Sequence, residues 1–327
     1  MSDIEWTDKV WNPVVGCSRV SAGCQNCYAE RFAHRGLTER HKGLTVMGSK
    51  GPRWTGEVRL VPEVLEAPLH WRKPRKVFVN SMSDLFHEGV PFEFIAAVFG
   101  VMAASPKHTF QVLTKRPKRA LEFFAWLWAP AALDKAACFA DEALTSRMPV
   151  AARAYAFAPG RGARTWPLPN VWLGVSVEDQ ATANERIPLL LECPAAVRWV
   201  SYEPALGPVD FKNIESSWNE MMLPLAGKTW SVGPPTKLVR SHAKLDWIVV
   251  GGESGPGARP FDLAWARNTV KQCAEAGVAC FVKQLGARSF DSENHYVNPH
   301  GDIRGKGGDM AEWPEDLRVR QWPEAAT

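Results

Sequence analysis

The chain has 327 residues, 46% hydrophobic and 23% charged, so it is long and apolar enough to bury a substantial core. Its formal net charge of +4 permits an anionic partner such as a nucleic acid without requiring one. The charged N-terminus and the lack of any apolar run near 20 residues argue against a secretory signal and a membrane span, so we expect a soluble, cytoplasmic protein.

Short apolar, β-branched runs recur along the chain, and most are followed by a helical pattern. Such alternation is typical of a parallel sheet covered by helices on both faces. Counting the N-terminal segment, we predict an α/β fold with six or seven strand units. It would be a partial (β/α)6-type TIM-like barrel, with an open doubly wound sheet as the alternative. The expected strands cover residues 77–80, 110–113, 171–175, 197–201, 247–250 and 279–282, and the expected helices cover 92–104, 120–128, a stretch ending near 191, and 263–276.

Two stretches interrupt this series and have the character of insertions on one domain. They lie at about residues 129–169 and 207–244, each between one strand unit and the next. Residues 288–327 show no clear period and are interpreted as an irregular C-terminal arm. We therefore expect one domain over residues 1–327 that carries two insertions and the arm. The sequence gives no indication of the oligomeric state.

Three of the seven cysteines lie within eleven residues, in the segment GCSRVSAGCQNCYAERF. Thiolates at this spacing can bind one soft metal centre from a single loop, which argues against a disulfide framework. A structural zinc site normally has four protein ligands, and neither His34 nor His41 has a familiar spacing for the fourth. Three thiolates leave one iron of a four-iron cluster open. We predict that Cys17, Cys24 and Cys27 form an N-terminal iron–sulfur loop that holds a [4Fe–4S] cluster.

The three-cysteine segment resembles the radical S-adenosylmethionine superfamily, in which an aromatic residue also follows the cysteines, as in CQNCYAE. Six residues separate the first two cysteines here, whereas the usual motif has three. Nearly the whole chain is similar to a phage-associated family of three-cysteine-motif proteins of unknown function, which distantly resembles spore photoproduct lyase. The segments that carry this similarity are WNPVVGCSRVSAGCQNCYAE, FVNSMSDLFHE, VLTKRP, LGVSVEDQ, VSYEPALGP, VVGGESGPGARP and GKGGDMAEWPEDLRVRQWP.

The resemblance implies a cofactor and a set of binding residues. S-adenosyl-L-methionine would bind the open iron, and reduction by an external electron donor would cleave it to methionine and a 5′-deoxyadenosyl radical. Ser81, Ser83 and Asp84 would then contact the methionyl group or the ribose, and Ser176 and Glu178 the ribose hydroxyls. Polar residues after a strand also cap the following helix, which is the alternative for each of these side chains.

Two carboxylates, Glu203 and Glu253, follow apolar strands and are expected near a buried pocket. Lys115, Arg116, Arg259 and Lys283 are their candidate partners. Either these groups form a buried ion-pair network or they contact the substrate. On the second interpretation, the candidate catalytic residues are Lys115, Glu203, Glu253 and Lys283.

Basic and aromatic residues alternate in the two insertions, as expected for a single-stranded or flipped-base substrate. The predicted function is therefore a radical enzyme that repairs or modifies a nucleobase in DNA, RNA or a nucleotide. The alternatives are a non-catalytic, metal-stabilised nucleic-acid-binding protein and a radical enzyme acting on a peptide or small metabolite. The residues concerned are Arg153, Arg161, Arg164, Lys237, Arg240, His242 and Lys244, with Tyr155, Phe157, Trp166 and Trp230.

Overall fold

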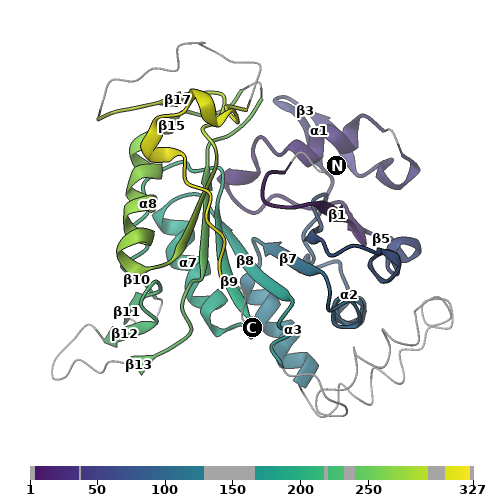
Figure 1. Cartoon of the computed structure of the whole chain (residues 1–327). Coiled ribbons are helices and arrows are strands. Elements are labelled where there is room, and N and C mark those ends of the chain that lie inside the picture. The colour runs from purple at the N-terminus through teal and green to yellow at the C-terminus, as the bar shows by residue number, and fades with distance from the viewer. Residues whose placement is uncertain are drawn as a thin grey trace. The chain divides into compact units, whose positions relative to one another are not determined.

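The chain divides into two compact units. Figure 1 labels its helices and strands. Unit 1 comprises residues 1–20, 27–173 and 193–196, and unit 2 comprises residues 21–26, 174–192 and 197–327. The computed structural model describes residues 4–36, 38–128, 166–216, 220–231, 240–255, 257–293 and 306–324.

The fold is mixed α/β, with a seven-stranded sheet whose recorded pairings are all parallel. This architecture is compatible with the expected partial TIM-like barrel. β8 is buried along its whole length; it begins in unit 1 and ends in unit 2. In sheet order the strands are β1 (Lys9–Trp11), β6 (Lys76–Val79), β7 (Thr109–Thr114), β8 (Val171–Val177), β9 (Val197–Tyr202), β14 (Trp247–Gly251) and β16 (Ala279–Gln284).

Smaller elements surround the strands of unit 1. A two-stranded antiparallel pair joins β2 to β5, and an antiparallel hairpin formed by β3 and β4 lies beside α1. The elements are β2 (Val14–Val15), α1 (Tyr28–His34), η2 (Glu39–His41), β3 (Thr45–Gly48), β4 (Gly51–Trp54), β5 (Arg59–Leu60), η3 (Pro62–Val64), η4 (Ala67–His70), α2 (Phe92–Ala104) and α3 (Pro117–Trp128).

Unit 2 adds helices and a small antiparallel sheet to its own strands. This four-stranded sheet, in the order β10-β11-β12-β13, lies between β9 and β14 in the sequence. The elements are η1 (Ala22–Cys24), α7 (Gln180–Glu192), β10 (Ile214–Glu215), β11 (Glu220–Leu223), β12 (Lys228–Ser231), β13 (Arg240–Ser241), β15 (Phe261–Asp262), α8 (Leu263–Ala276), β17 (Ser289–Phe290), η5 (Met310–Glu312) and η6 (Glu315–Leu317).

Local signals explain where the main helices begin and end. The Asp262 side chain accepts a hydrogen bond from the Ala264 N–H at the start of α8, and Gly277 ends this helix in the left-handed conformation with a φ of 64°. α2 follows Pro91 and buries ten of its residues, which matches its almost continuous apolar sequence. α3 begins at Pro117, three residues before the expected start, because proline is well suited to the first turn of a helix.

The six expected strands are confirmed as β6, β7, β8, β9, β14 and β16, and the expected helices as α2, α3, α7 and α8. The second insertion contains the sheet β10–β13, whereas residues 129–165 of the first lie outside the described residues. The described part of the C-terminal arm runs along β16, where the Val282 N–H donates to the Val319 carbonyl at 2.8 Å and the Gln321 N–H to that of Cys280 at 2.8 Å. The expectation of a single domain stays a prediction. No helix in the described ranges is long and apolar enough to cross a membrane.

Candidate functional site

Residues 17–27, here called the cysteine loop, start where the chain leaves β2. Gly16 has a φ of 90°, and a Cβ at this position would lie 2.3 Å from the Glu57 carbonyl oxygen, so only glycine passes here without strain. Its N–H donates to the Met82 carbonyl at 3.1 Å, beside a parallel bridge to Ser83. The first cysteine is therefore fixed next to the segment that follows β6.

Two of the three cysteines belong to unit 1 and pack against the same apolar cluster. Cys17 and Cys27 are both partly buried there. Cys24 ends η1 in unit 2 and is also partly buried. The six cysteines in the described ranges are outside disulfides, which leaves the three loop sulfurs as thiols. The cluster consists of Val15, Ala29, Ala33, Leu44, Trp54, Val61 and Met82.

The donor set suits an iron–sulfur cluster in its chemistry, because three thiols on one loop are soft ligands. Within the described residues, however, no three Cys, His, Asp or Glu side chains are grouped closely enough to hold a metal ion. Metal binding by Cys17, Cys24 and Cys27 therefore stays a prediction.

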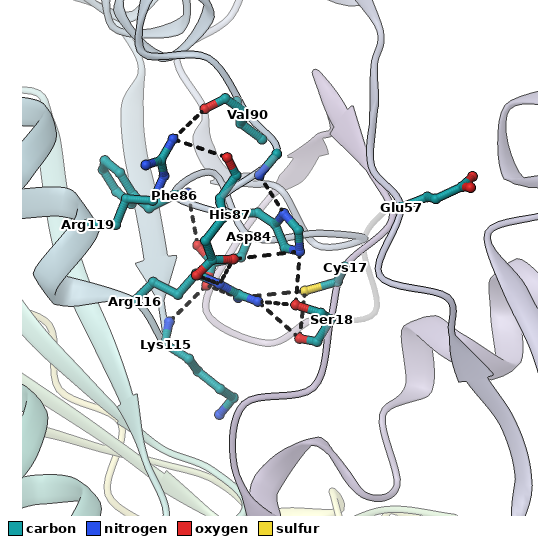
Figure 2. Close-up of polar contacts among 12 residues, drawn as sticks. Cys17, Ser18, Glu57, Asp84, Phe86, His87, Val90, Lys115, Arg116 and Arg119 are labelled. Carbon is teal, nitrogen blue, oxygen red and sulfur yellow. Dashed lines mark hydrogen bonds and ion pairs between the residues drawn. The ribbon is translucent and has the colours of Figure 1, made fainter.

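The Arg116 guanidinium, directly after β7, binds the first part of the cysteine loop (Figure 2). Its Nη1 lies 3.8 Å from the Cys17 Sγ, and its Nη2 donates to the Ser18 carbonyl at 3.1 Å and to the Ser18 Oγ at 2.7 Å. Nε donates to both Glu88 oxygens at 3.1 Å. Burial opposes the charged form, but Asp84, Cys17 and Glu88 raise the pKa of Arg116, so a permanent cation lies beside the cysteine sulfur.

Asp84 is buried under this guanidinium and is saturated with hydrogen bonds. Its carboxylate accepts from Arg116 Nη1 at 3.2 Å, from the Lys115 N–H at 3.0 Å and from the Phe86 N–H at 3.0 Å. The Thr114 hydroxyl lies 2.8 Å from one oxygen and 3.0 Å from the other. Asp84 thus positions Arg116. The Lys115 side chain points away from this network in Figure 2.

His87 also faces the loop, and its hydrogen bonds define its tautomer. The Gly89 N–H donates to Nδ1 at 3.0 Å, so in the neutral ring Nε2 carries the proton and donates to the Ser18 Oγ at 2.9 Å. Burial, and then the nearby Arg116 charge, lower the pKa of His87, which keeps the ring neutral near pH 7. His87 therefore cannot accept the Ser18 proton, so this Ser–His pair is not an activated nucleophile.

Ser81 and Ser83 connect the strand end after β6 to the N-terminal segment. The Ser83 hydroxyl donates to the Val14 carbonyl at 2.8 Å, and the Ser81 hydroxyl donates to Asn12 Oδ1 at 3.1 Å. The Tyr28 hydroxyl donates to the Ser81 carbonyl at 2.6 Å. In this arrangement both serines stabilise the start of the cysteine loop, and their predicted contact with a cofactor stays untested.

In unit 2, Glu178 holds the middle of the cysteine loop. This fully buried carboxylate follows β8, pairs with Arg186 Nη1 at 3.2 Å and accepts from the Ser21 hydroxyl at 3.1 Å. Arg186 also donates to the Ser176 carbonyl at 2.7 Å. A Cβ at Gly23 would lie 2.3 Å from Glu178 Oε1, so the loop backbone approaches the carboxylate very closely.

Gly23→Ala is expected to destabilise unit 2 by about 1–3 kcal/mol, because the new methyl group overpacks a carboxylate that is itself fixed by Arg186 and Ser21. Gly207→Ala is the matched control, since a Cβ there would meet only Asp179 Cβ at 3.6 Å. Chemical denaturation of the two variants measures the difference. Equal stabilities would contradict the close approach of Gly23 to Glu178.

Glu253, after β14, binds the same part of the loop through Arg259 and Asn26. Its Oε1 pairs with Arg259 Nη2 at 2.7 Å, and its Oε2 accepts from Asn26 Nδ2 at 2.9 Å. Arg259 Nη1 donates to the Ala22 carbonyl at 2.9 Å, and Asn26 also donates to the Gly257 carbonyl at 2.9 Å. Burial by itself would raise the pKa of Glu253, but the hydrogen bonds from Arg259 and Asn26 lower it overall.

This lowered pKa makes the stability of unit 2 depend on pH. Because the folded-state pKa of Glu253 lies below its ordinary 4.5, its stabilising effect is complete above pH 4.5 and is lost as the pH falls through the folded-state value. Glu253→Gln should therefore be less stable than the wild type at pH 7, with a difference that shrinks on acidification. Glu215→Gln, at an exposed position of unit 2, should show no such trend in urea unfolding between pH 3 and 7.

Glu203 and Lys283 form the second predicted ion pair, at 3.2 Å, after β9 and on β16. The Ser201 hydroxyl lies 3.4 Å from Glu203 Oε2, and the Ser176 hydroxyl donates to the Glu203 carbonyl at 3.2 Å. Their side chains are 13% and 19% exposed, so the pair is accessible at the carboxyl ends of its strands. The observed pairs Glu203–Lys283 and Glu253–Arg259 agree with the ion-pair alternative, and catalytic roles for Lys115, Glu203, Glu253 and Lys283 stay predictions.

Several site residues were not predicted from the sequence. Ser18 and Asn26 lie inside the cysteine motif, and His87 lies in the segment FVNSMSDLFHE. Their position in or near a motif was the only sequence feature that could have identified these three as site residues. Arg186 lies mid-helix and gave no signal. Of the residues expected to contact nucleic acid, Arg153, Tyr155, Phe157, Arg161, Arg164 and Lys237 lie outside the described residues.

Comparison with known proteins yields a family and no individual relative. No curated protein matches the chain, and no solved structure does. A family model described as "Protein of unknown function (DUF5131)" matches residues 1–313, which include the whole cysteine loop and all seven strands of the main sheet. The chain therefore belongs to the DUF5131 family.

Proposed function

We propose that the protein is a radical S-adenosylmethionine enzyme that binds a [4Fe–4S] cluster through Cys17, Cys24 and Cys27. The observation that carries this proposal is that residues at the ends of several strands bind the cysteine loop. In unit 1, Arg116 after β7 binds residues 17 and 18. In unit 2, Glu178 after β8 and Glu253 with Arg259 after β14 bind residues 21, 22 and 26. Each part of the loop is thus held at the carboxyl ends of parallel strands, where α/β barrels build their active sites.

A bound cluster would supply the reductive cleavage of S-adenosyl-L-methionine to methionine and a 5′-deoxyadenosyl radical. The role of the protein is to bind the cluster and to keep water away from it. Arg116 places a positive charge beside the Cys17 sulfur, which stabilises a thiolate ligand. The apolar cluster under Cys17 and Cys27 keeps water away from one side of the sulfurs. Glu178 and Glu253 fix the backbone on both sides of Cys24.

As the substrate class we propose a nucleobase in DNA, RNA or a nucleotide. This part rests on the basic and aromatic residues of the two insertions and on the mildly basic chain. The Glu203–Lys283 pair offers a partly exposed carboxylate and ammonium for polar contacts with a base. Such a pair can both donate and accept hydrogen bonds, as recognition of a base edge requires.

Anaerobic reconstitution with iron and sulfide tests the proposal. The reconstituted protein should contain about four iron atoms per chain. With dithionite and S-adenosyl-L-methionine it should form 5′-deoxyadenosine, measured by chromatography. A loaded cluster without 5′-deoxyadenosine would contradict the enzymatic activity, and one tightly bound zinc ion instead of iron would favour a metal-stabilised binding protein.

A further inference from the structure

The C-terminal arm of unit 2 lies along β16 and places Arg320 over one of its side chains. Arg320 pairs with Phe281 in an antiparallel bridge, and hydrogen bonds on either side of this bridge join the arm to β16. Successive side chains of an extended strand point to opposite faces, so Arg320 and Trp322 are expected on the same face. Both do contact Phe281, and the Trp322 ring also stacks on Trp247 with centroids 5.0 Å apart.

The Arg320 guanidinium is half-buried and contacts two aromatic rings. Its carbon lies 5.2 Å from the ring centroid of Phe281 and 5.6 Å from that of Trp313. The Trp313 ring is itself fixed, because its Nε1 donates to the Gly307 carbonyl at 3.0 Å. Arg320 Nη2 donates to the Lys283 carbonyl at 3.4 Å. Cation–π contacts stabilise a guanidinium but leave its charge without a counter-ion.

The charge of Arg320 is not compensated as that of other arginines in unit 2 is. Arg186, Arg259 and Arg267 pair with carboxylates at 3.2, 2.7 and 2.8 Å. In the part of the chain that the structure describes, Arg320 has no carboxylate partner, its hydrogen bond goes to the Lys283 carbonyl, and its buried Nε has no partner. Cations of low exposure are normally paired, and buried N–H groups normally have an acceptor. This pattern favours a counter-charge that a bound ligand brings.

The guanidinium and the Glu203–Lys283 pair lie on one face of β9, β14 and β16. The Trp199 and Trp247 rings contact each other with centroids 5.4 Å apart, and Trp247 contacts the Phe281 ring that the guanidinium covers. Glu203 comes four residues after Trp199, so the alternation of side chains along β9 directs it to the same face. The cation on the arm and the partly exposed ion pair can therefore contact one ligand.

We propose that Arg320 binds the phosphate group of a nucleotide whose base contacts the Glu203–Lys283 pair. This inference rests on the substrate class of the proposed function. A guanidinium can donate two parallel hydrogen bonds to phosphate oxygens, and Arg320 keeps Nη1 and one N–H of Nη2 for them. Lys283 connects the two ends of the site, with its carbonyl at Arg320 and its ammonium at Glu203. An extended lysine side chain is similar in length to the span from a base edge to its own phosphate.

The phosphate is either the 5′-phosphate of a free nucleotide or a backbone phosphate of a single strand. In both cases the contact positions the substrate and carries no information about the base. Arg320 should therefore strengthen the binding of every nucleotide by a similar factor, and this contribution should fall as salt rises.

Substitutions of Arg320 in the full chain test the site. Arg320→Gln should weaken the binding of nucleoside 5′-monophosphates, or of short single-stranded DNA of mixed sequence, about tenfold, because it removes charge-assisted hydrogen bonds. Arg320→Lys keeps the charge without the planar fork and should weaken binding about threefold. Lys271→Gln is the matched control, since it removes a positive charge at an exposed position of α8 and should change binding less than about twofold.

The arm should stay in place in both Arg320 variants, because Trp322 still stacks on Trp247 and Gln321 still donates to the Cys280 carbonyl. Near-UV circular dichroism checks this. The salt dependence provides a readout that a purely structural role would not move. For single-stranded DNA, the slope of log K against log salt should be smaller by about 0.7 in Arg320→Gln, the value for one lost phosphate contact.

Calorimetry measures the binding of the monophosphates and of the corresponding nucleosides, and fluorescence anisotropy measures the binding of labelled DNA. Removing the phosphate from the ligand should weaken its binding to the wild type and leave its binding to Arg320→Gln unchanged. Arg320-dependent binding of monophosphates identifies a free nucleotide as the phosphate source, and such binding of DNA alone identifies a strand. Equal affinities of Arg320→Gln and Lys271→Gln for every ligand would overturn the proposal, as would a wild type that binds none of them.

Formation of 5′-deoxyadenosine by the reconstituted wild type is measured separately. If it forms while Arg320→Gln binds every ligand as the control does, this inference fails and the proposed radical activity stands. If the protein takes up no cluster but loses phosphate binding in Arg320→Gln, the phosphate site stands and the radical activity fails.

Discussion

Replacing any one of Cys17, Cys24 and Cys27 by alanine is expected to abolish both iron–sulfur cluster binding and 5′-deoxyadenosine formation. Three thiolates are the minimum set for a four-iron cluster with one open iron, and with two the cluster would be bound too weakly to survive purification. Iron and sulfide analysis, together with the visible absorbance of the anaerobic protein, measures the loss.

The structure indicates that these variants will remain folded, so loss of iron will report on the ligands. Without the Cys17 sulfur, Arg116 still binds Asp84, Glu88 and Ser18. Without the Cys24 sulfur, the loop is still held by Ser21 and Asn26. Circular dichroism should match that of the wild type.

Cys193→Ala and Cys273→Ala are the matched controls. Both thiols are fully buried, and neither lies on the cysteine loop, so these variants should take up iron as the wild type does. Retention of a full cluster by a loop variant, or its loss in a control, would show that the sequence spacing misidentified the ligands.

The main sheet could be predicted from the sequence because its strands are continuous apolar runs. β8 and β14 are buried along their whole length, and every residue from Val171 to Val177 packs against other parts of the chain. The bounds of α8 were predicted correctly because Asp262 and Gly277 are strong local signals. These features depend on neighbours in the sequence, which pattern analysis can detect.

The smaller sheets could not be predicted, for an equally physical reason. The strands of the sheet β10–β13 have two to four residues each, too few to show a period. In the hairpin β3–β4 only Trp54 is buried and the other residues are half-buried or exposed, without alternation between a buried and an exposed face. Their strand character comes from pairing with each other, and no single short segment encodes it.

In the candidate site, too, features set by sequence neighbours could be predicted, whereas contacts between distant residues could not. The ion pairs of Glu203 and Glu253 were among the sequence predictions because each carboxylate follows an apolar strand and needs a cation. The hydrogen bonds from Ser21 to Glu178 and from Asn26 to Glu253 join residues 157 and 227 positions apart. Such contacts depend on how strand ends meet in three dimensions. The residues of the loop could therefore be predicted from the sequence, but which side chains bind the loop could not.

Arg116 is the anchor with the largest expected effect on stability. Its guanidinium is 5% exposed and binds the buried carboxylate of Asp84, whose side chain is 8% exposed. Arg116→Met should destabilise unit 1 by about 3–5 kcal/mol, because Asp84 then remains as a buried charge without its cation. The Ser18 carbonyl would lose a donor as well, and the start of the cysteine loop would lose its attachment to β7.

Lys118→Met controls for the loss of a positive charge, since Lys118 is exposed in the first turn of α3 and its replacement should change stability by less than about 0.5 kcal/mol. Hydrogen exchange at the β6 and β7 amides measures the effect within unit 1 residue by residue. Adding Asp84→Asn to Arg116→Met removes the stranded charge. The remaining side-chain oxygen can still accept from the Thr114 hydroxyl and from one of the two N–H groups, Phe86 or Lys115, which donate to separate oxygens of the carboxylate. The double variant should therefore be more stable than Arg116→Met alone, with a coupling of about 0.5–3 kcal/mol. An Arg116→Met protein as stable as Lys118→Met would mean that Arg116 does not hold the loop through Asp84.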